Sequence, residues 1–133
     1  MSTEAFRSAV HTLVEATMAA FPGVPVFYEN GPEVDEASVG NVFLDVEIRW
    51  YSAKLVSMGQ GGAGRDTGAI SLQVFYKNAE GTKVVDELVD DLRDAFKSKR
   101  IGSGVTQMPQ RSVPTHLKGW YKSGVFVPFH LDT

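Results

Sequence analysis

The sequence predicts an α+β fold, in which a single-layer antiparallel or mixed β-sheet carries two main helices packed on one face. Two segments repeat apolar residues at three- and four-residue steps, which is the period of a helix with one buried side. Two others alternate apolar and polar residues, as strands with one buried face do. The length of 133 residues and the absence of internal repeats indicate one domain over residues 1–133. The predicted order is α-β-β-β-α-β-β, a layered α+β arrangement.

The first helix is expected over residues 2–20. Ser2 or Thr3 can cap its start, Glu4 suits the positive first turn, and the dipeptide Pro22-Gly23 ends it. Its apolar stripe consists of Phe6, Val10, Leu13, Val14, Met18 and Phe21. A short strand over residues 24–28 follows, then a turn at residues 30–32 and an acidic loop that ends at residue 41.

The next two strands are predicted over residues 42–51 and 69–77. Residues 42–51 alternate most regularly, with Val42, Leu44, Val46, Ile48 and Trp50 on one face. We expect the two strands to pair as a long antiparallel hairpin. Residues 57–68 between them contain five glycines, which predicts an irregular, mobile tip.

The second helix is expected over residues 82–99, with Gly102 as the cap after its end. Its apolar stripe consists of Val85, Leu88, Val89, Leu92, Ala95 and Phe96. Two more strands are predicted over residues 105–113 and 116–131. Pro109 interrupts the first, and Pro128 places the second at a sheet edge or at a bulge. Gly119 and Gly124 indicate a turn or a bulge.

Composition excludes several classes of function. The formal net charge of −3 lacks the basic excess typical of a freestanding nucleic-acid binder. The chain has no cysteine, which excludes disulfides, cysteine-ligated zinc, iron–sulfur clusters and thiol catalysis. No apolar run approaches the roughly 20 residues of a membrane helix. We therefore expect a soluble, intracellular protein.

Residues 59–64 match the dinucleotide motif G-x-G-x-x-G, which works only where a helix opens directly after it. A strand pattern follows here, so a hairpin tip that contacts a partner is the favoured interpretation. The alternative function is a small-molecule- or nucleotide-binding α+β domain that uses this loop. The candidate partner-interaction residues are Gly59, Gln60, Gly61, Gly62, Gly64, Arg65 and Asp66.

No catalytic residue, cofactor or metal site is predicted, and the chain is not expected to be an enzyme. The three histidines lie on distant elements without metal-ligand spacing. The second helix carries acidic residues on one side, which favours a solvated face and leaves a docking surface for a basic partner as the alternative. These residues are Glu87, Asp90, Asp91 and Asp94.

Aromatic residues are expected on both faces of the sheet. In the pairs Trp50-Tyr51 and Trp120-Tyr121, neighbouring side chains point to opposite faces of a strand. Phe43 also lies off the main apolar stripe, as does Phe75 in the next strand. The outer aromatic residues form either a protein–protein surface or a layer covered by the chain's own loops.

The order of these elements resembles that of a known family. Residues 24–30 read VPVFYEN after the first helix, and the apolar strand of residues 42–50 is followed by the glycine-rich interruption. Residues 68–75 read GAISLQVF, and a turn at Gly81 leads to the helix of residues 84–96. Over nearly the whole chain this pattern resembles the small tail terminator and tail completion proteins of long-tailed bacteriophages. That group is similar to the minor tail protein U of lambda-like phages.

The resemblance implies a structural virion protein of a phage or prophage. Family members are α+β proteins that assemble as hexameric rings on the finished end of the tail tube, stop its polymerisation and help to join tail to head. The partners implied are further copies of the chain, the tail tube protein and a head-completion or neck protein. Neither a membrane nor sequence-specific nucleic acid is implied. The expected location is the virion tail or neck, and the host cytoplasm during assembly.

Overall fold

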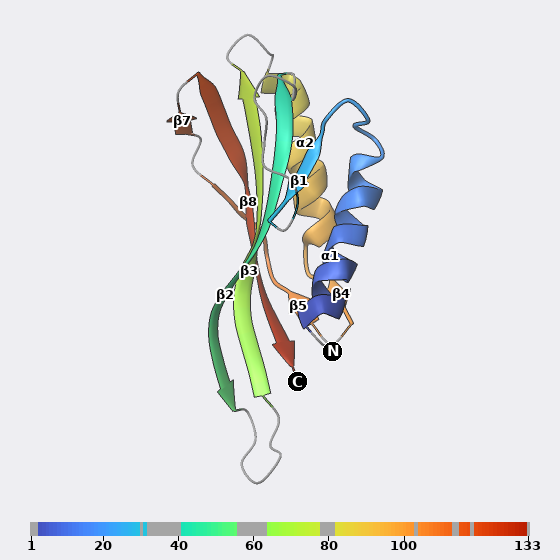
Figure 1. Ribbon diagram of the computed structural model, residues 1–133, viewed down its shortest axis with the longest axis vertical. Coiled ribbons are helices and arrows are strands. Elements are labelled where there is room, and N and C mark those ends of the chain that lie inside the picture. Colours follow the sequence, from blue (N-terminus) through green and yellow to red (C-terminus); the bar gives the residue numbers. More distant parts are fainter. Residues whose placement is uncertain are drawn as a thin grey trace.

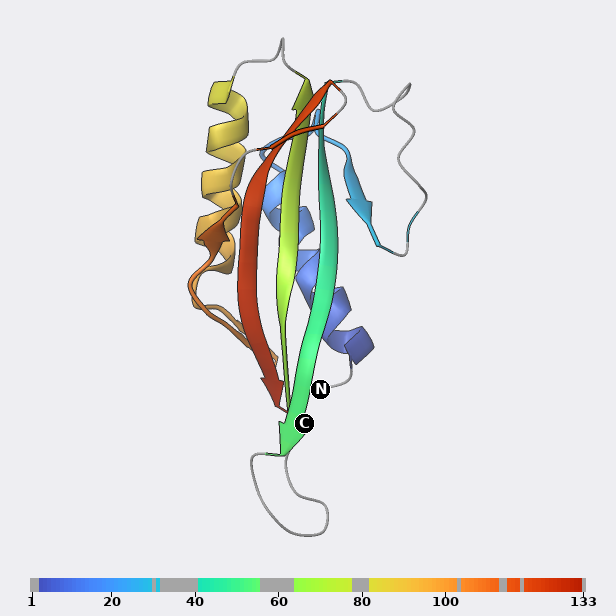
Figure 2. The same cartoon turned by 90° about the vertical axis from the view of Figure 1, so that its left-hand side faces the viewer.

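The computed structural model describes residues 3–29, 31, 41–55, 64–77, 82–102, 104–112, 115–117 and 119–132. Over these residues the chain forms one mixed, mostly antiparallel sheet with two helices on the same face (Figure 1). The predicted α+β fold class is confirmed. Three long strands cross the molecule from end to end, and in the view of Figure 2 the N-terminal helix passes behind them while the second helix stands to their left.

The elements follow one another along the chain with short connections after the second helix. The helices are α1 (Thr3–Met18) and α2 (Thr82–Phe96). The long strands are β2 (Val42–Leu55), β3 (Gly64–Lys77) and β8 (Trp120–Asp132). The short ones are β1 (Val26–Tyr28), β4 (Arg100–Ile101), β5 (Gly104–Thr106), β6 (Gln110–Arg111) and β7 (Thr115–Leu117).

The sheet has the order β1-β2-β3-β8-β5-β4, and β6 and β7 also pair with β8. Only the β1–β2 pair is parallel among the described strands. The centre of the sheet is a continuous register across β2, β3 and β8, in which Ile48, Ile70 and Val127 lie side by side. β8 comes last along the chain but lies between β3 and β5, so the interior of the sheet is completed by residues 120–132.

The main core lies between the helices and the sheet. α1 buries Phe6, Val10, Val14 and Met18, and α2 buries Val85, Leu88, Val89, Leu92 and Phe96. Every second residue of the long strands faces these side chains. The apolar stripes predicted for both helices are confirmed, with Leu13, Phe21 and Ala95 partly buried at the margins.

The end of α2 differs from the prediction. The helix ends at Phe96 and not at residue 99, and Gly102 is not its cap. The Thr106 hydroxyl of β5 donates to the Phe96 carbonyl at 2.6 Å and accepts from the Lys99 amide at 2.6 Å. Ser98 has a left-handed φ of 49°. The cap therefore comes from a strand ten residues away, and local residue types do not reveal it.

The prediction that residues 57–68 form one irregular tip is wrong for its second half. Gly64 to Gly68 belong to β3, and β2 continues to Leu55. Both extensions are paired, because β3 has β2 on one edge and the end of β8 on the other. Two neighbouring strands satisfy the backbone there, which overrides the low strand propensity of glycine.

The last third of the chain holds more strands than the two predicted. Gly119, with φ of 86°, separates β7 from β8, which confirms the turn expected there. β8 is an interior strand, so the prediction of an edge or a bulge at Pro128 is wrong. On its far edge β8 pairs with β5 up to Phe129 and with β6 from Phe126. Pro128 lies between these two pairings, where its missing N–H leaves no ladder bond unmade.

Neither helix of the described residues is long and apolar enough to cross a membrane.

Candidate functional site: the outer face of the sheet

The outer face is the side of the sheet that the helices leave uncovered, and it is turned toward the viewer in Figure 2. One end of it holds a second, smaller core made by Phe43, Trp120, Phe27 and Phe75. The Phe43 ring stacks on Phe75 at 4.8 Å and meets Trp120 edge-on at 5.2 Å between centroids. These outer aromatic side chains therefore cover one another. Tyr51 differs from them, because 65% of it is exposed.

A groove of about 530 Å³ lies toward the other end of the outer face. Ala69, Phe126 and Pro128 supply apolar lining from the two central strands, while Gln107 and Gln110 line it from the segment beside β8. Arg49 and Tyr51 of β2 complete the lining. The Arg49 guanidinium lies 5.6 Å from the centre of the Phe126 ring and 3.5 Å from the Glu47 carboxylate. Arg49 is the one charged residue that lines the groove over the described part of the chain.

Polar side chains separate the groove from the aromatic cluster. The Ser112 hydroxyl donates to the Gln73 amide oxygen at 3.3 Å, and the Gln73 amide donates to the Ser71 hydroxyl at 3.4 Å. Burial raises the pKa of Asp45 on the same face, and the neighbouring Glu47 charge adds to this, while Lys122 and Arg49 oppose it. The middle of the outer face is thus polar and internally bonded, which leaves the groove as its more apolar recess.

The hairpin of β2 and β3 projects beyond the helices at the lower end of the molecule (Figure 1). The candidate residues Gly59, Gln60, Gly61 and Gly62 lie outside the described residues. Gly64, Arg65 and Asp66 open β3 and are partly buried. Arg65 donates twice to Asp132 at the end of β8, with Nε to Oδ1 at 2.7 Å and Nη2 to Oδ2 at 3.1 Å. This contact holds the pKa of Asp132 below its usual value and ties the hairpin to the C-terminal strand.

Gly68 lets aromatic rings meet at the base of this hairpin. It lies between Trp50 and Phe129 in the register. A Cβ at Gly68 would stand 2.1 Å from the Arg49 carbonyl oxygen and 3.0 Å from the Phe129 ring. The Trp50 and Phe129 rings instead contact each other edge-on at 5.2 Å, and Phe6 of α1 packs against both. The space left at Gly68 therefore lets these three rings pack together, and their contacts hold the base of the hairpin against α1.

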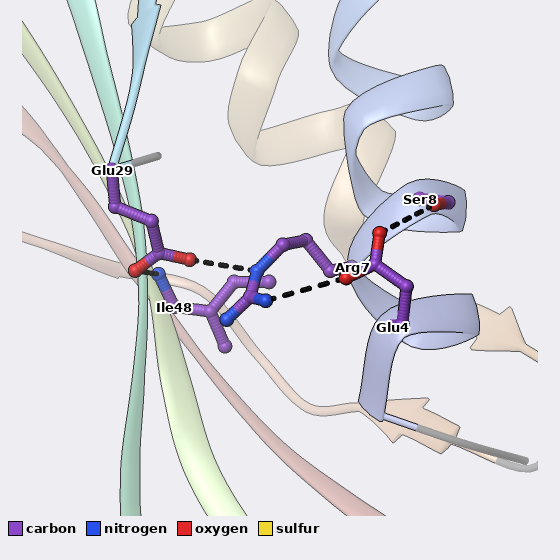
Figure 3. A network of polar contacts seen from close by, with 5 residues as sticks. All are labelled: Glu4, Arg7, Ser8, Glu29 and Ile48. Atoms are coloured by element: carbon purple, nitrogen blue, oxygen red, sulfur yellow. Dashed lines mark hydrogen bonds and ion pairs between the residues drawn. The ribbon is translucent and has the colours of Figure 1, made fainter. Parts of the chain in front are cut away.

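A polar network joins α1 to the edge of β2 (Figure 3). Arg7 Nε donates to Glu29 Oε1 at 3.0 Å and Arg7 Nη1 lies 3.5 Å from Glu4 Oε2. The second Glu29 oxygen accepts the Ile48 N–H at 3.3 Å. Earlier in the parallel ladder the Leu44 N–H donates to the Pro25 carbonyl at 2.9 Å. The Glu29 carboxylate therefore continues the hydrogen bonding of β1 one step past its last residue.

Glu29→Ala is expected to lower the free energy of unfolding by about 1–2 kcal/mol, because the Ile48 N–H loses its acceptor. Glu29→Gln keeps an acceptor at that position and loses the ion pair with Arg7, so a loss of up to about 1 kcal/mol is expected. Urea unfolding of both variants measures the difference. Equal losses would show that the Ile48 hydrogen bond contributes nothing.

His11 and Tyr28 form a second contact between α1 and β1. Their rings lie 4.0 Å apart, and the Tyr28 hydroxyl donates to Glu15. Burial and this hydrogen bond raise the pKa of Tyr28. His11 Nε2 is buried without a hydrogen-bond partner. Burial, and then the nearby Arg7 charge, lower the pKa of His11, while Glu29, Glu4 and Glu15 act in the opposite direction.

Acidification is expected to destabilise the fold through His11. Because its pKa is lower in the folded state, the unfolded chain takes up this proton first as the pH falls through about 6.5. The free energy of unfolding should therefore decrease between about pH 7.5 and pH 5.5. His11→Phe keeps a ring against Tyr28 and removes the titration, so its pH dependence should be shallower in this range. Urea unfolding at several pH values measures this dependence. If the free energy of unfolding changed with pH as steeply in His11→Phe as in the original chain, the assignment would be contradicted.

The described residues contain no group of three or more His, Asp or Glu side chains that could hold a metal ion. The three histidines remain apart: His11 contacts Tyr28, His116 contacts Tyr121 at 4.7 Å between ring centroids, and His130 lies opposite Thr67.

The acidic side of α2 is exposed, as expected for a helix face that contacts solvent. Arg111 of β6 donates to Asp86 at 2.8 Å and lies 3.8 Å from Asp90. Glu87, Asp91 and Asp94 take no part in the ion pairs of the described residues. Among the described residues, the acidic side chains of α2 thus divide into two that pair with Arg111 of β6 and three that are exposed and outside those ion pairs.

Comparison with known proteins places the fold. No family model matches the chain, and no curated protein matches it. A solved structure that bears no descriptive name superposes with a TM-score of 0.72 and 16% identity, over 98% of this chain and 95% of its own. The two chains share one fold. At this identity the likeness supports the α+β architecture and carries no activity or partner.

The groove was not predicted from the sequence. Its lining comes from β2, β3, β8, β6 and the segment before β6, which meet only in the folded sheet. Arg49, Tyr51 and Phe126 each occupy outward positions in alternating segments, and that alternation was the available signal. It indicates a face, but not which positions across three strands lie together.

Proposed function

We propose that this chain is a structural virion protein of a long-tailed phage or prophage, a ring-forming tail terminator that caps the tail tube and helps to join tail to head. The order of elements described above supports the proposal. In that role the chain would bind further copies of itself, the tail tube protein and a neck protein. It would act through surfaces and not through catalysis.

The observation that carries the proposal is the projecting hairpin beside an uncovered sheet face. β2 and β3 run past the helices (Figures 1 and 2). β8 braces the hairpin through the hydrogen bonds from Arg65 to Asp132. The same sheet offers the groove with exposed Tyr51 next to this hairpin. In a subunit that assembles with other chains, the projecting hairpin and the groove could both form contacts with neighbouring subunits.

The alternative, a nucleotide-binding loop at residues 59–64, has less support. Pyrophosphate binding by this motif needs the amides of a helix N-terminus directly after the glycines. β3 begins at Gly64 and pairs on both edges soon afterwards, so a strand occupies that place.

Capping of tail tubes tests the proposal. The chain is mixed with polymerising tail tube protein, and tube length is measured by electron microscopy, with size-exclusion chromatography and light scattering for the chain alone. A terminator should shorten tubes in proportion to its concentration and appear at one end of them. Tubes of unchanged length with no bound chain would count against the proposal.

Deleting residues 59–64 is expected to leave the fold intact and to abolish capping. Residues 56–58 remain to connect β2 with Arg65, and a loop of this length can close a hairpin. Circular dichroism and urea unfolding check the fold, and the tube-length measurement checks capping. An unfolded deletion variant would show that the tip is structural, and full capping by a folded one would exclude the tip from the contact.

A further inference from the structure

The groove and one side of α2 have complementary chemistry. On α2, Val84, Glu87, Asp91 and Asp94 follow one another at three- and four-residue steps and form a line, here named the acidic stripe. It points away from the buried side of the helix, and 51% of Val84 is exposed. The stripe thus offers one apolar side chain and three carboxylates to solvent.

The groove presents the opposite set of groups. Arg49, Tyr51, Gln107 and Gln110 can all donate hydrogen bonds, and carboxylates only accept them. The bond from Arg49 to Glu47 is long at 3.5 Å, and both side chains are nearly half exposed, so Arg49 can change partners at little cost. Phe126 and Pro128 offer an apolar surface for a side chain such as Val84.

We infer that the acidic stripe of one copy docks in the groove of the next copy. The helices cover one face of the sheet and the groove lies on the other, so both surfaces of one chain can be occupied at once. Such a contact is heterologous: it leaves one groove and one stripe free at the ends of any open assembly, and it is saturated only when a ring closes. The inference rests on the proposed function, because it names the contact that would build the ring.

Disulfide trapping tests the contact, since the chain has no cysteine of its own. Tyr51→Cys and Asp91→Cys both change exposed residues. One variant carries a mass tag, and the two are mixed and oxidised. We expect a tagged–untagged dimer from the mixture, and a ladder of covalent oligomers from the double variant. Thr12→Cys, exposed on α1, replaces Asp91→Cys in the matched control and should give only background.

Charge reversal tests the chemistry of the same contact. Arg49→Glu in the Tyr51→Cys background should lower the trapped yield about tenfold, because it places a carboxylate opposite the stripe. When that variant is mixed with Glu87→Arg in the Asp91→Cys background, much of the trapped yield should return, because the two charges are then exchanged across the contact. A yield no higher than the Thr12 control, or one insensitive to Arg49→Glu, would overturn the inference. Tyr51→Cys trapped on tail tube protein in place of a second copy would overturn it as well.

The same variants separate this inference from the proposed function when they are oxidised on capped tubes. Capping without a disulfide between the cysteines introduced at positions 51 and 91 would overturn the contact and leave the terminator function standing. The disulfide ladder without any capping would support the contact and count against the terminator.

Discussion

Phe129→Ala is expected to lower the free energy of unfolding by about 3–5 kcal/mol. The Phe129 side chain is 2% exposed and its ring lies 4.7 Å from Phe6 and 5.2 Å from Trp50, between centroids. Its removal opens a cavity where α1, β2 and β8 meet. Because the rings meet beside Gly68, β3 has no side chain there to fill the space.

Chemical denaturation followed by tryptophan fluorescence measures this loss, with Trp50 as a local reporter. Tyr51→Ala is the matched control, since it removes an aromatic ring that is 65% exposed. Its expected effect stays within about 0.5 kcal/mol. Comparable losses in the two variants would show that the ring cluster is not a centre of stability.

Gly124→Ala is expected to cost about 3 kcal/mol, because β8 approaches β3 too closely to admit a side chain. A Cβ at Gly124 would lie 2.1 Å from the Leu72 carbonyl oxygen and 2.8 Å from the Gln73 Cα. Both neighbours are backbone atoms of the central strand, so a rotamer change cannot relieve the clash. The β3–β8 pairing itself has to open.

Gly23→Ala is the matched substitution for this test, because no atom lies within 4 Å of its added Cβ. Both changes restrict the unfolded chain equally, so the difference between them reports the clash. Thermal and urea unfolding of the pair measure it. A Gly124→Ala protein as stable as the Gly23→Ala protein would mean that β8 does not approach β3 so closely.

The helices and the central strands could be predicted because their burial repeats along the chain. The period in α2 selects Leu88, Leu92 and Phe96, and all three are fully buried. Short strands carry no such period. β4 and β6 hold two residues each, and they exist because an edge of a neighbouring strand lies beside them.

The candidate site was predictable only in part. The tip sequence and the acidic side of α2 were visible as local patterns, and the structure confirms that this side is exposed. The structure places Arg65 against Asp132, 67 residues further along the chain, and residue types alone do not reveal a pair so distant in sequence. The groove has the same origin, since Arg49 and Phe126 meet across three strands.

By itself the sequence determined the fold class, the buried side of each helix and the alternation of the central strands, because these depend on burial periods within one segment. Only the tertiary structure decided where α2 ends, how far the hairpin extends and that β8 lies inside the sheet. These features depend on long-range hydrogen bonds: Thr106 ends a helix formed earlier in the chain, and β8 supplies the second paired edge for Arg65 to Gly68. A backbone group is satisfied by whichever partner the fold brings to it, and that partner is known only once the chain is folded.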